Sequence, residues 1–369
     1  MKITNITTYF LPGDPRPEAW CPRQPHVFVR VETTSGIAGW GEAYTLRGRE
    51  KSLVELIGAM AEQLIGTDVS AIKGFNHWVY NRFGEQRVGI DVFCASSGIE
   101  IALWDALGRS LDMPVYQLIG GTCHDTLPAY ANFWSPQRKT ADQLAAKAME
   151  CLEAGFTMLK FYPFQASENV AEGIEKLRVM REAIGPDIKL AADLWRHASP
   201  DQARELCRLM EPFDLFWVED AIPPNNPAVI RRLRDQVRQP LITGETLATK
   251  RQFAPLFDIQ ATGMVNPDVC ACGGILELRE IAAMAEPKQI LISPHNFNSM
   301  ALGLAATIHA AAGIPNLLPV EFFPEFAEDV DEVCSGGLLP EEGQFAMPAQ
   351  PGLGIEFDME KMERYRISD

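Results

Sequence analysis

The sequence predicts an α/β fold: a modified TIM barrel, (β/α)7β, with an N-terminal α+β capping domain that the C-terminal tail completes. Three observations predict it. From Leu127 onward, short apolar runs alternate with helical patterns, which is the rhythm of a parallel barrel. Before that point, strand patterns come first and helical patterns follow, as in an α+β domain. With 369 residues, the chain is also too long for one ordinary core.

We expect three parts: a capping domain at 1–126, a barrel at 127–328, and a Gly- and Pro-rich tail at 329–369 that returns to the capping domain. In the first part, alternating apolar and β-branched residues predict strands, and apolar residues at helical spacing predict helices. The strands are Lys2–Phe10, His26–Thr33 and Ile37–Glu42, and the helices are 49–65 and Ala95–Ser110.

The barrel part contains eight strand candidates and seven helical patterns between them. The strands are Leu127–Phe133, Thr157–Phe161, Ile188–Ala192, Phe216–Val218, Leu241–Gly244, Gly263–Asn266, Ile290–Ser293 and Leu317–Val320. The helices are Ala141–Ala154, Asn169–Ile184, Pro200–Met210, Pro227–Val237, Lys250–Leu256, Gly274–Ala285 and Ser299–Ala312.

Three consecutive barrel strands each end in an acidic residue: Asp193, Glu219 and Glu245, at equal spacings of 26 residues. In a parallel barrel the strand ends converge on one face, so these carboxylates should meet there. Three convergent carboxylates stay ionised only with positive charge between them. Oxygen ligands suit Mg²⁺, so the pattern predicts one Mg²⁺ per subunit. The alternative is that these residues only cap the following helices.

The other strand ends carry a second set of reactive groups, Lys160, Tyr162, Asp268, His295 and Glu321. The strands before Asp268 and His295 are neighbours in a barrel, so the carboxylate can hydrogen-bond the imidazole. Such a bond fixes the tautomer and raises the basicity of the other ring nitrogen. We therefore expect His295 to be a general base, rather than a satisfied polar residue.

Composition excludes several classes of function. The net charge of −16 argues against a nucleic-acid partner, and no apolar run is long enough to span a membrane. The eight cysteines are scattered through apolar segments without a secretory signal, so we expect reduced thiols and a cytoplasmic protein. Cys270-Ala271-Cys272 lacks a second pair and a flanking His, which argues against zinc.

The ordered strand-end set resembles the mandelate racemase subgroup of the enolase superfamily over nearly the whole chain. The set is Lys160, Asp193, Glu219, Glu245, Asp268, His295 and Glu321; Ile101–Asp105, Arg181–Asp187, Cys272–Ile275 and Pro351–Gly354 also match. The resemblance implies abstraction of the proton α to a carboxylate, giving an enediolate held on Mg²⁺. It also implies a small-molecule carboxylate substrate and a homo-oligomer, between a dimer and an octamer. Lys160 would contact the substrate carboxylate, and a protonated Glu321 would hydrogen-bond the enediolate oxygen.

Tyr162 departs from the family pattern, because racemases carry a second, basic Lys at that place. Tyrosine has an ordinary pKa of about 10, so it is a poor base, although it can act as an acid. A single base, His295, fits loss of a β-hydroxyl, which sugar acid dehydratases of this family perform. We therefore expect a hydro-lyase that converts an aldonate or aldarate into a 2-keto-3-deoxy acid.

Other functions stay open. An epimerase, racemase or cycloisomerase would use the same metal and base. A non-catalytic protein that keeps the fold, or a metallohydrolase, is less consistent with a complete acidic triad and six His. The Pro-rich segment Leu11–Pro25 and Ala43–Arg49 should close over the barrel, with Trp20, Tyr44 and Arg47 touching the distal substrate. Trp195 should also bind substrate, and His197 lies two residues further on. Which sugar binds is set by such loops and is not predicted.

Overall fold

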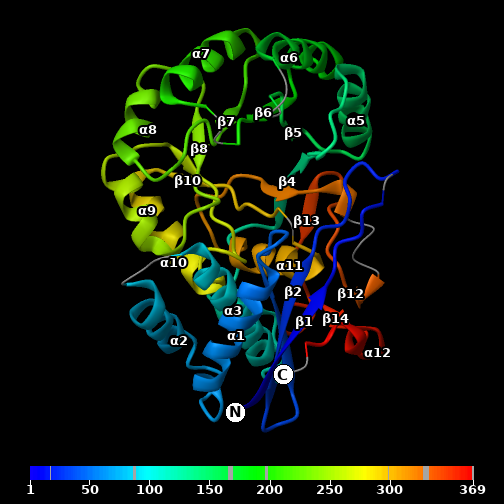
Figure 1. Ribbon diagram of the computed structural model, residues 1–369, viewed down its shortest axis with the longest axis vertical. Helices are drawn as coiled ribbons and strands as arrows, with labels where there is room; N and C mark the ends of the chain where they lie inside the picture. The colour runs from blue at the N-terminus through cyan, green and yellow to red at the C-terminus, as the bar shows by residue number, and fades with distance from the viewer. Residues whose placement is uncertain are drawn as a thin grey trace.

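The structure, a computed structural model, consists of a barrel and a smaller domain packed against one end of it (Figure 1). The chain begins in the smaller domain and also ends there (Figure 1). The structure describes residues 1–16, 18–85, 89–164, 169–195, 198–297, 299–326 and 332–367.

The capping domain is an antiparallel sheet covered by helices. Its sheet has the order β1-β2-β3, with β1 at Ile3–Leu11, β2 at His26–Thr33 and β3 at Ala38–Ala43. Its helices are α1 (Glu50–Leu64), α2 (Ile72–Val79), a π-helix η1 (Tyr80–Gly84), α3 (Ile90–Ser110) and α4 (Val115–Leu118). Helices α2, η1 and α4 were not predicted from the sequence, and α3 begins five residues before its predicted start.

Glycines let strand β3 approach helix α3 closely. A Cβ atom on Gly41 would lie 1.9 Å from the Gly98 carbonyl oxygen, and one on Gly39 would lie 2.2 Å from that of Ala102. Only glycine permits such backbone contact. The close packing buries Val29, Ala43 and Ile99 in the core of the capping domain.

The second part is a parallel barrel, as predicted. Its strands are β4 (Thr126–Asn132), β5 (Met158–Phe161), β6 (Lys189–Asp193), β7 (Trp217–Glu219), β8 (Leu241–Thr243), β9 (Met264–Val265), β10 (Leu291–Ile292) and β11 (Val320–Phe322). Each pairs in parallel with the next from β4 to β10, and β11 pairs with β4. A parallel bridge between Ile292 and Leu317 closes the ring.

Seven helices connect the barrel strands and form an outer layer (Figure 1). They are α5 (Ala141–Glu153), α6 (Val170–Ile184), α7 (Pro200–Met210), α8 (Pro227–Arg234), α9 (Thr249–Asp258), α10 (Ile275–Ala285) and α11 (Ala301–Ala311). Helix α7 shows why they form. Ser199 caps it in a capping box with Gln202, Pro200 occupies its first turn, and Ala203, Cys207 and Met210 are buried on one face.

The C-terminal tail contacts both parts. Strand β12 (Cys334–Ser335) pairs with β14 (Glu356–Phe357), while β13 (Gln344–Ala346) pairs with barrel strand β4. In the capping domain, Phe357 stacks on Trp40 at 4.3 Å between ring centroids, and the Ile367 N–H donates to the Thr8 carbonyl. Helix α12 (Met359–Met362) lies in this final segment, which is red in Figure 1.

Buried carboxylates of the capping domain cap helices of the barrel. Glu42 accepts hydrogen bonds from the backbone N–H groups of Met300 and Gly303 at the start of α11. Glu100 accepts from the N–H groups of Ile275 and Leu276 at the start of α10. A carboxylate at a helix N-terminus satisfies otherwise unpaired donors. These bonds fix the orientation of the capping domain over the barrel.

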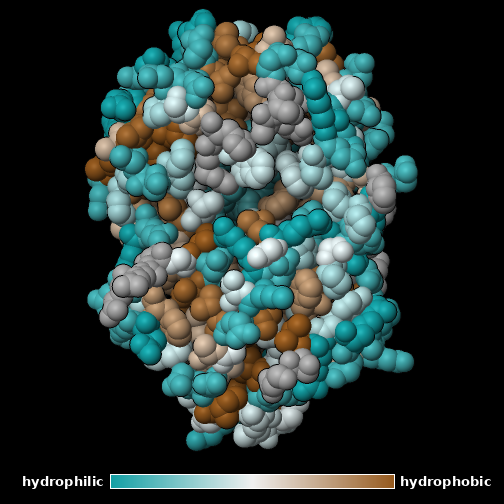
Figure 2. All heavy atoms as spheres, in the orientation of Figure 1, coloured by the Kyte–Doolittle hydropathy of each residue, from teal (hydrophilic) through white to brown (hydrophobic). Residues whose placement is uncertain are grey.

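The visible face of the molecule is mostly hydrophilic, with apolar residues in separate groups (Figure 2). Over the described residues, no helix is both long enough and apolar enough to cross a membrane.

The buried imidazole of His309 should make stability depend on pH. Burial lowers its pKa from the ordinary 6.5 to about 4, and its Nδ1 accepts the Tyr116 N–H at 3.0 Å. Below pH 6.5 the unfolded chain binds a proton that the folded chain does not, so stability falls as pH decreases towards 4. When the pH is lowered from about 7.5 to about 5.5, we expect the unfolding free energy of the wild type to fall by about 1 kcal/mol more than that of His309→Asn. Urea titrations at the two pH values measure this difference. Equal losses would contradict this.

Candidate active site

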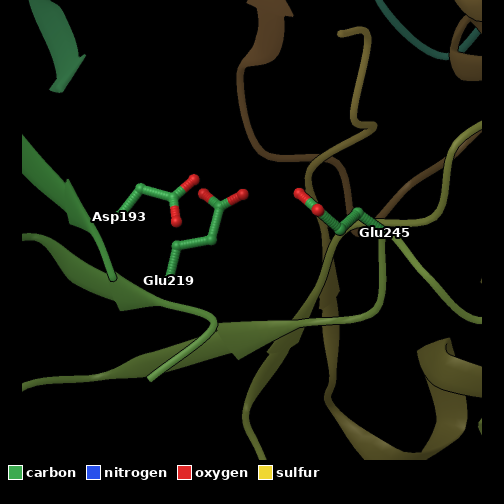
Figure 3. Close-up of side chains that lie close together, drawn as sticks. All are labelled: Asp193, Glu219 and Glu245. Atoms are coloured by element: carbon green, nitrogen blue, oxygen red, sulfur yellow. The ribbon is translucent and has the colours of Figure 1, made fainter. Parts of the chain in front are cut away.

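Asp193, Glu219 and Glu245 lie together at the carboxyl ends of β6, β7 and β8. Figure 3 shows Asp193 and Glu219 side by side, with Glu245 pointing towards them from the opposite side. One carboxylate oxygen of each lies within 4.8 Å of those of the other two. Asp193 and Glu219 are buried, and Glu245 is partly exposed. The three strand-end carboxylates therefore converge as the sequence predicted.

The backbone adopts unusual conformations beside these strand ends. Trp195 has a φ of 46°, and its N–H donates to Asp193 Oδ1 at 2.8 Å. Asp220, directly after Glu219, has a φ of 43°. Gly244 precedes Glu245 with a φ of 139°, and a Cβ there would lie 2.8 Å from Phe253. Non-glycine residues rarely adopt such conformations, and strained backbone concentrates at functional sites.

The residues present fit one small divalent cation. Oxygens bound to one Mg²⁺ are about 4.2 Å apart at most, so the observed grouping needs only small side-chain rotations. Burial raises the pKa values of Asp193 and Glu219, because ionised carboxylates are costly in a desolvated place. A bound divalent cation would remove that cost. The donor set is all oxygen, which suits a hard cation.

Lys160 provides positive charge beneath the carboxylates. Its Nζ lies 2.8 Å from Glu219 Oε2, 2.7 Å from Glu321 Oε1 and 3.6 Å from Asp193 Oδ2, and its side chain is fully buried. Burial lowers its pKa, but the neighbouring carboxylates outweigh burial and hold the pKa well above its ordinary value. We expected Lys160 to contact the substrate carboxylate. In this structure the ammonium group is held between buried carboxylates and does not line the cavity described below, so its contact with a substrate carboxylate stays a prediction.

His295 and Asp268 form the predicted pair. His295 Nδ1 donates to Asp268 Oδ2 at 2.7 Å, and both side chains are buried. The other ring nitrogen, Nε2, lies 3.2 Å from Glu245 Oε2 and 3.7 Å from Glu321 Oε2. Burial lowers the pKa of His295, but Glu245, Glu321 and Asp268 together raise it well above its ordinary value. A divalent cation bound by Glu245 would offset the largest of these raising effects and so favour the neutral imidazole that a base requires. Asp268 thus orients the imidazole, and Nε2 points towards the carboxylates of Glu245 and Glu321.

The contacts of Glu321 favour its ionised form in this structure, whereas the expected hydrogen bond to an enediolate oxygen needs the protonated form and stays a prediction. Burial raises the pKa of Glu321, but the opposing effect of Lys160 and His295 is larger and lowers the pKa to about 2. Asn132 also donates to its Oε1 at 2.8 Å, and the Asn296 N–H donates to its Oε2 at 3.0 Å. Every one of these contacts favours the anion. Glu321 therefore accepts hydrogen bonds here and positions Lys160.

Tyr162 occupies the place of the second lysine in racemases and is not a base. Burial, followed by the nearby Asp193 carboxylate, raises its pKa well above the ordinary value. Its hydroxyl donates a hydrogen bond to Asp193, which lowers the pKa of that carboxyl. The phenol therefore keeps its proton and helps to hold a carboxylate of the triad.

A cavity of about 370 Å³ opens above Glu245 and His295. Both parts of the protein line it: Trp134, Tyr162, Trp195, Glu245, Thr246, His295 and Phe297 from the barrel, and Tyr44, Leu46, Arg49, Ile90, Asp91 and Cys94 from the capping domain. Tyr44 and Trp195 thus reach the cavity, as expected. A cavity of this size suits a small organic ligand.

Trp20 and Arg47, which were expected to touch the distal part of the substrate, do not line the cavity in this structure. The Trp20 indole N–H donates to the Phe133 carbonyl at 2.9 Å, and Lys139 lies over its ring. The Arg47 side chain is exposed, and its neighbours Leu46 and Arg49 line the cavity instead. His197 lies outside the described residues.

Sequence reasoning missed residues that support the site. Asn266, at the end of β9, donates to Glu219 Oε1 at 2.9 Å. Asn132, at the end of β4, donates to Glu321 as noted above. Both residues stand at the carboxyl end of a barrel strand, which is the feature that identified the carboxylates. A search of the strand ends for amide side chains would therefore have found them. Arg49 ends the segment Ala43–Arg49 that was expected to close over the barrel, although its own role was not predicted, and no sequence signal indicated Asp91.

Comparisons with known proteins agree with this architecture. Residues 20–120 match the mandelate racemase / muconate lactonizing enzyme N-terminal domain, and residues 143–361 match the enolase C-terminal domain-like family. The chain is 30% identical to a D-galactonate dehydratase of Cronobacter sakazakii, covering 98% of this chain and 94% of that protein. It is 29% identical to a D-xylonate dehydratase of Haloferax volcanii, and the match covers 99% of this chain and 89% of that protein. A crystal structure of the 3,6-anhydro-D-galactonate cycloisomerase from Zobellia galactanivorans superposes with a TM-score of 0.88 at 28% identity, covering 100% of both chains.

Proposed function

This chain belongs to the mandelate racemase and muconate lactonizing enzyme family of the enolase superfamily, and we propose that it is a Mg²⁺-dependent acid sugar dehydratase. The observation that carries the proposal is the imidazole of His295, whose Nε2 lies 3.2 Å from Glu245 of the carboxylate triad and which is the one His ring lining the cavity among the described residues. The dehydratase names of relatives at about 30% identity support it.

A divalent cation in the triad would stabilise the negative charge that develops when the proton α to a carboxylate is removed. His295 Nε2 takes that proton, while Asp268 holds Nδ1–H and stabilises the imidazolium. The imidazolium then donates its proton to the β-hydroxyl as the C–O bond breaks, and water leaves. The resulting enol tautomerises to a 2-keto-3-deoxy acid. Tyr162 and Trp195 hold Asp193 in place throughout.

A cycloisomerase is the second candidate, because one structural relative carries that activity in its name. It would use the same base and the same carboxylates, so the site geometry does not separate the two reactions. The products do, since dehydration of a linear acid sugar releases water and leaves a new keto group.

The experiment that tests the proposal is a screen of linear aldonic and aldaric acids of five and six carbons with Mg²⁺ present. We expect at least one acid to give a semicarbazide-reactive keto product at a rate about 10⁶-fold or more above the uncatalysed reaction. An anhydro sugar acid belongs in the same screen. Turnover of the anhydro acid alone would favour the cycloisomerase, and no turnover of any acid would contradict both.

Two further expectations accompany the proposal. We propose a cytoplasmic protein, consistent with eight free cysteines, of which all but Cys123 are buried. We also propose a homo-oligomer, which light scattering can check.

A further inference from the structure

Arg49 and Asp91 form an ion pair in the capping-domain wall of the active-site cavity. Arg49 Nη1 lies 3.1 Å from Asp91 Oδ1, and both residues line the cavity. Arg49 precedes helix α1, and Asp91 is in the first turn of helix α3. Their side chains are 50% and 37% exposed, so both remain accessible to a ligand. The pair would therefore face the end of a bound substrate that points away from the barrel.

The pair brings both signs of charge to the cavity and no net charge. Apart from Arg49, the described lining residues include one other group that can be cationic, His295, and it already faces Asp268 and Glu245. The remaining capping-domain lining is uncharged: Tyr44, Leu46, Ile90 and Cys94. The positive end of the α3 dipole is already matched by Asp91 in its first turn.

From this charge balance we infer that the Arg49–Asp91 pair selects a substrate with one carboxylate and a neutral polyhydroxyl tail, an aldonic rather than an aldaric acid. A hydroxyl both donates and accepts, so it can bond the guanidinium and the carboxylate of the pair together. A second substrate carboxylate only accepts, and it would lie beside the like charge of Asp91. The inference rests on the proposed function and narrows its substrate class.

Exposed ion pairs are weak, so the bond to Asp91 does not prevent Arg49 from binding a substrate carboxylate instead. A pair this exposed contributes little to stability, and a distal carboxylate could compete for Arg49. Asp91 would nevertheless remain in the cavity wall, where it would have lost Arg49 as its partner and would repel the distal carboxylate of the substrate. Asp91 is therefore the residue that rejects a dicarboxylate, and Arg49 is a donor to either ligand.

The test compares an aldonic acid with the aldaric acid of the same length and configuration, at saturating Mg²⁺. We expect the wild type to favour the aldonate by about tenfold or more in kcat/KM. Asp91→Asn removes the like charge and keeps the shape, so it should reduce that preference by about tenfold, mainly by raising kcat/KM for the aldarate. Asp142→Asn is the matched control. It makes the same change at an exposed site in the first turn of α5, and should leave both values unchanged.

The outcomes separate this inference from the proposed function. A keto product from both acids with equal kcat/KM would overturn the selection and leave dehydration standing, as would an unchanged preference in Asp91→Asn. If neither acid is turned over, the proposed function fails. Thermal shifts with Mg²⁺ and each acid then decide the inference, since equal stabilisation by the two acids, or none by either, would overturn it.

Discussion

Replacing His295 with asparagine is expected to lower kcat by about 10³-fold or more and to stop exchange of the substrate α-proton with solvent deuterium. The reason is that Nε2 of His295 faces the carboxylate group, while Nδ1 is held by Asp268. Tyr162 keeps its proton, and Lys160 is buried between carboxylates, so neither is a free base. Exchange is followed by NMR of the substrate in deuterium oxide.

Two variants make the result specific. Asp268→Asn keeps the imidazole but loses the acceptor that fixes its tautomer, so turnover should fall with a smaller loss than in His295→Asn. His309→Asn makes the same substitution at a buried imidazole of helix α11, outside the lining of the cavity, and near pH 7.5 it should retain wild-type turnover. Full exchange in His295→Asn would mean that another group is the base.

Removing divalent cations is expected to abolish turnover and to lower the melting temperature by several degrees. Without a divalent cation, Lys160 is the positive charge beside Asp193 and Glu219, and His295 is the group that faces Glu245. A ligand that binds only the folded state at about 100 times its Kd stabilises that state by about 2.7 kcal/mol. Treatment with EDTA, followed by Mg²⁺ titration, measures both effects in one series.

A carboxylate variant ties the effect to this site. Glu219→Gln should lose the rise in melting temperature on Mg²⁺ addition, because an amide binds a hard cation more weakly than a carboxylate. Glu211→Gln, an exposed position after helix α7, should keep it. A normal Mg²⁺ response in Glu219→Gln would place the cation elsewhere.

The barrel was predictable because its signals are local and repeated. All eight strands and all seven helices lie within a few residues of their predicted positions, since apolar strands and caps such as Ser199 and Pro200 are short-range features. The triad was predictable for the same reason, because parallel strand ends converge whatever the rest of the chain does.

The capping domain shows where sequence reasoning failed. Helix α2 and the π-helix η1 were missed, since Ile72–Val79 is a short helix without a capping side chain. The ion pairs that Lys160 makes with Glu219 and Glu321 were not predicted, because contacts inside a buried network depend on three-dimensional neighbours. Arg49 and Asp91 are 42 positions apart in the sequence, and no sequence pattern predicts such a contact.

The most direct test of the central claim is product analysis in deuterium oxide, with Mg²⁺ and the best acid sugar from the screen. The account predicts a 2-keto-3-deoxy acid that carries one solvent deuterium at C3, because the enol formed on water loss collects its new C3 hydrogen from solvent. An acid that keeps its β-hydroxyl and shows inversion at C2 would contradict dehydration and indicate epimerisation by the same base.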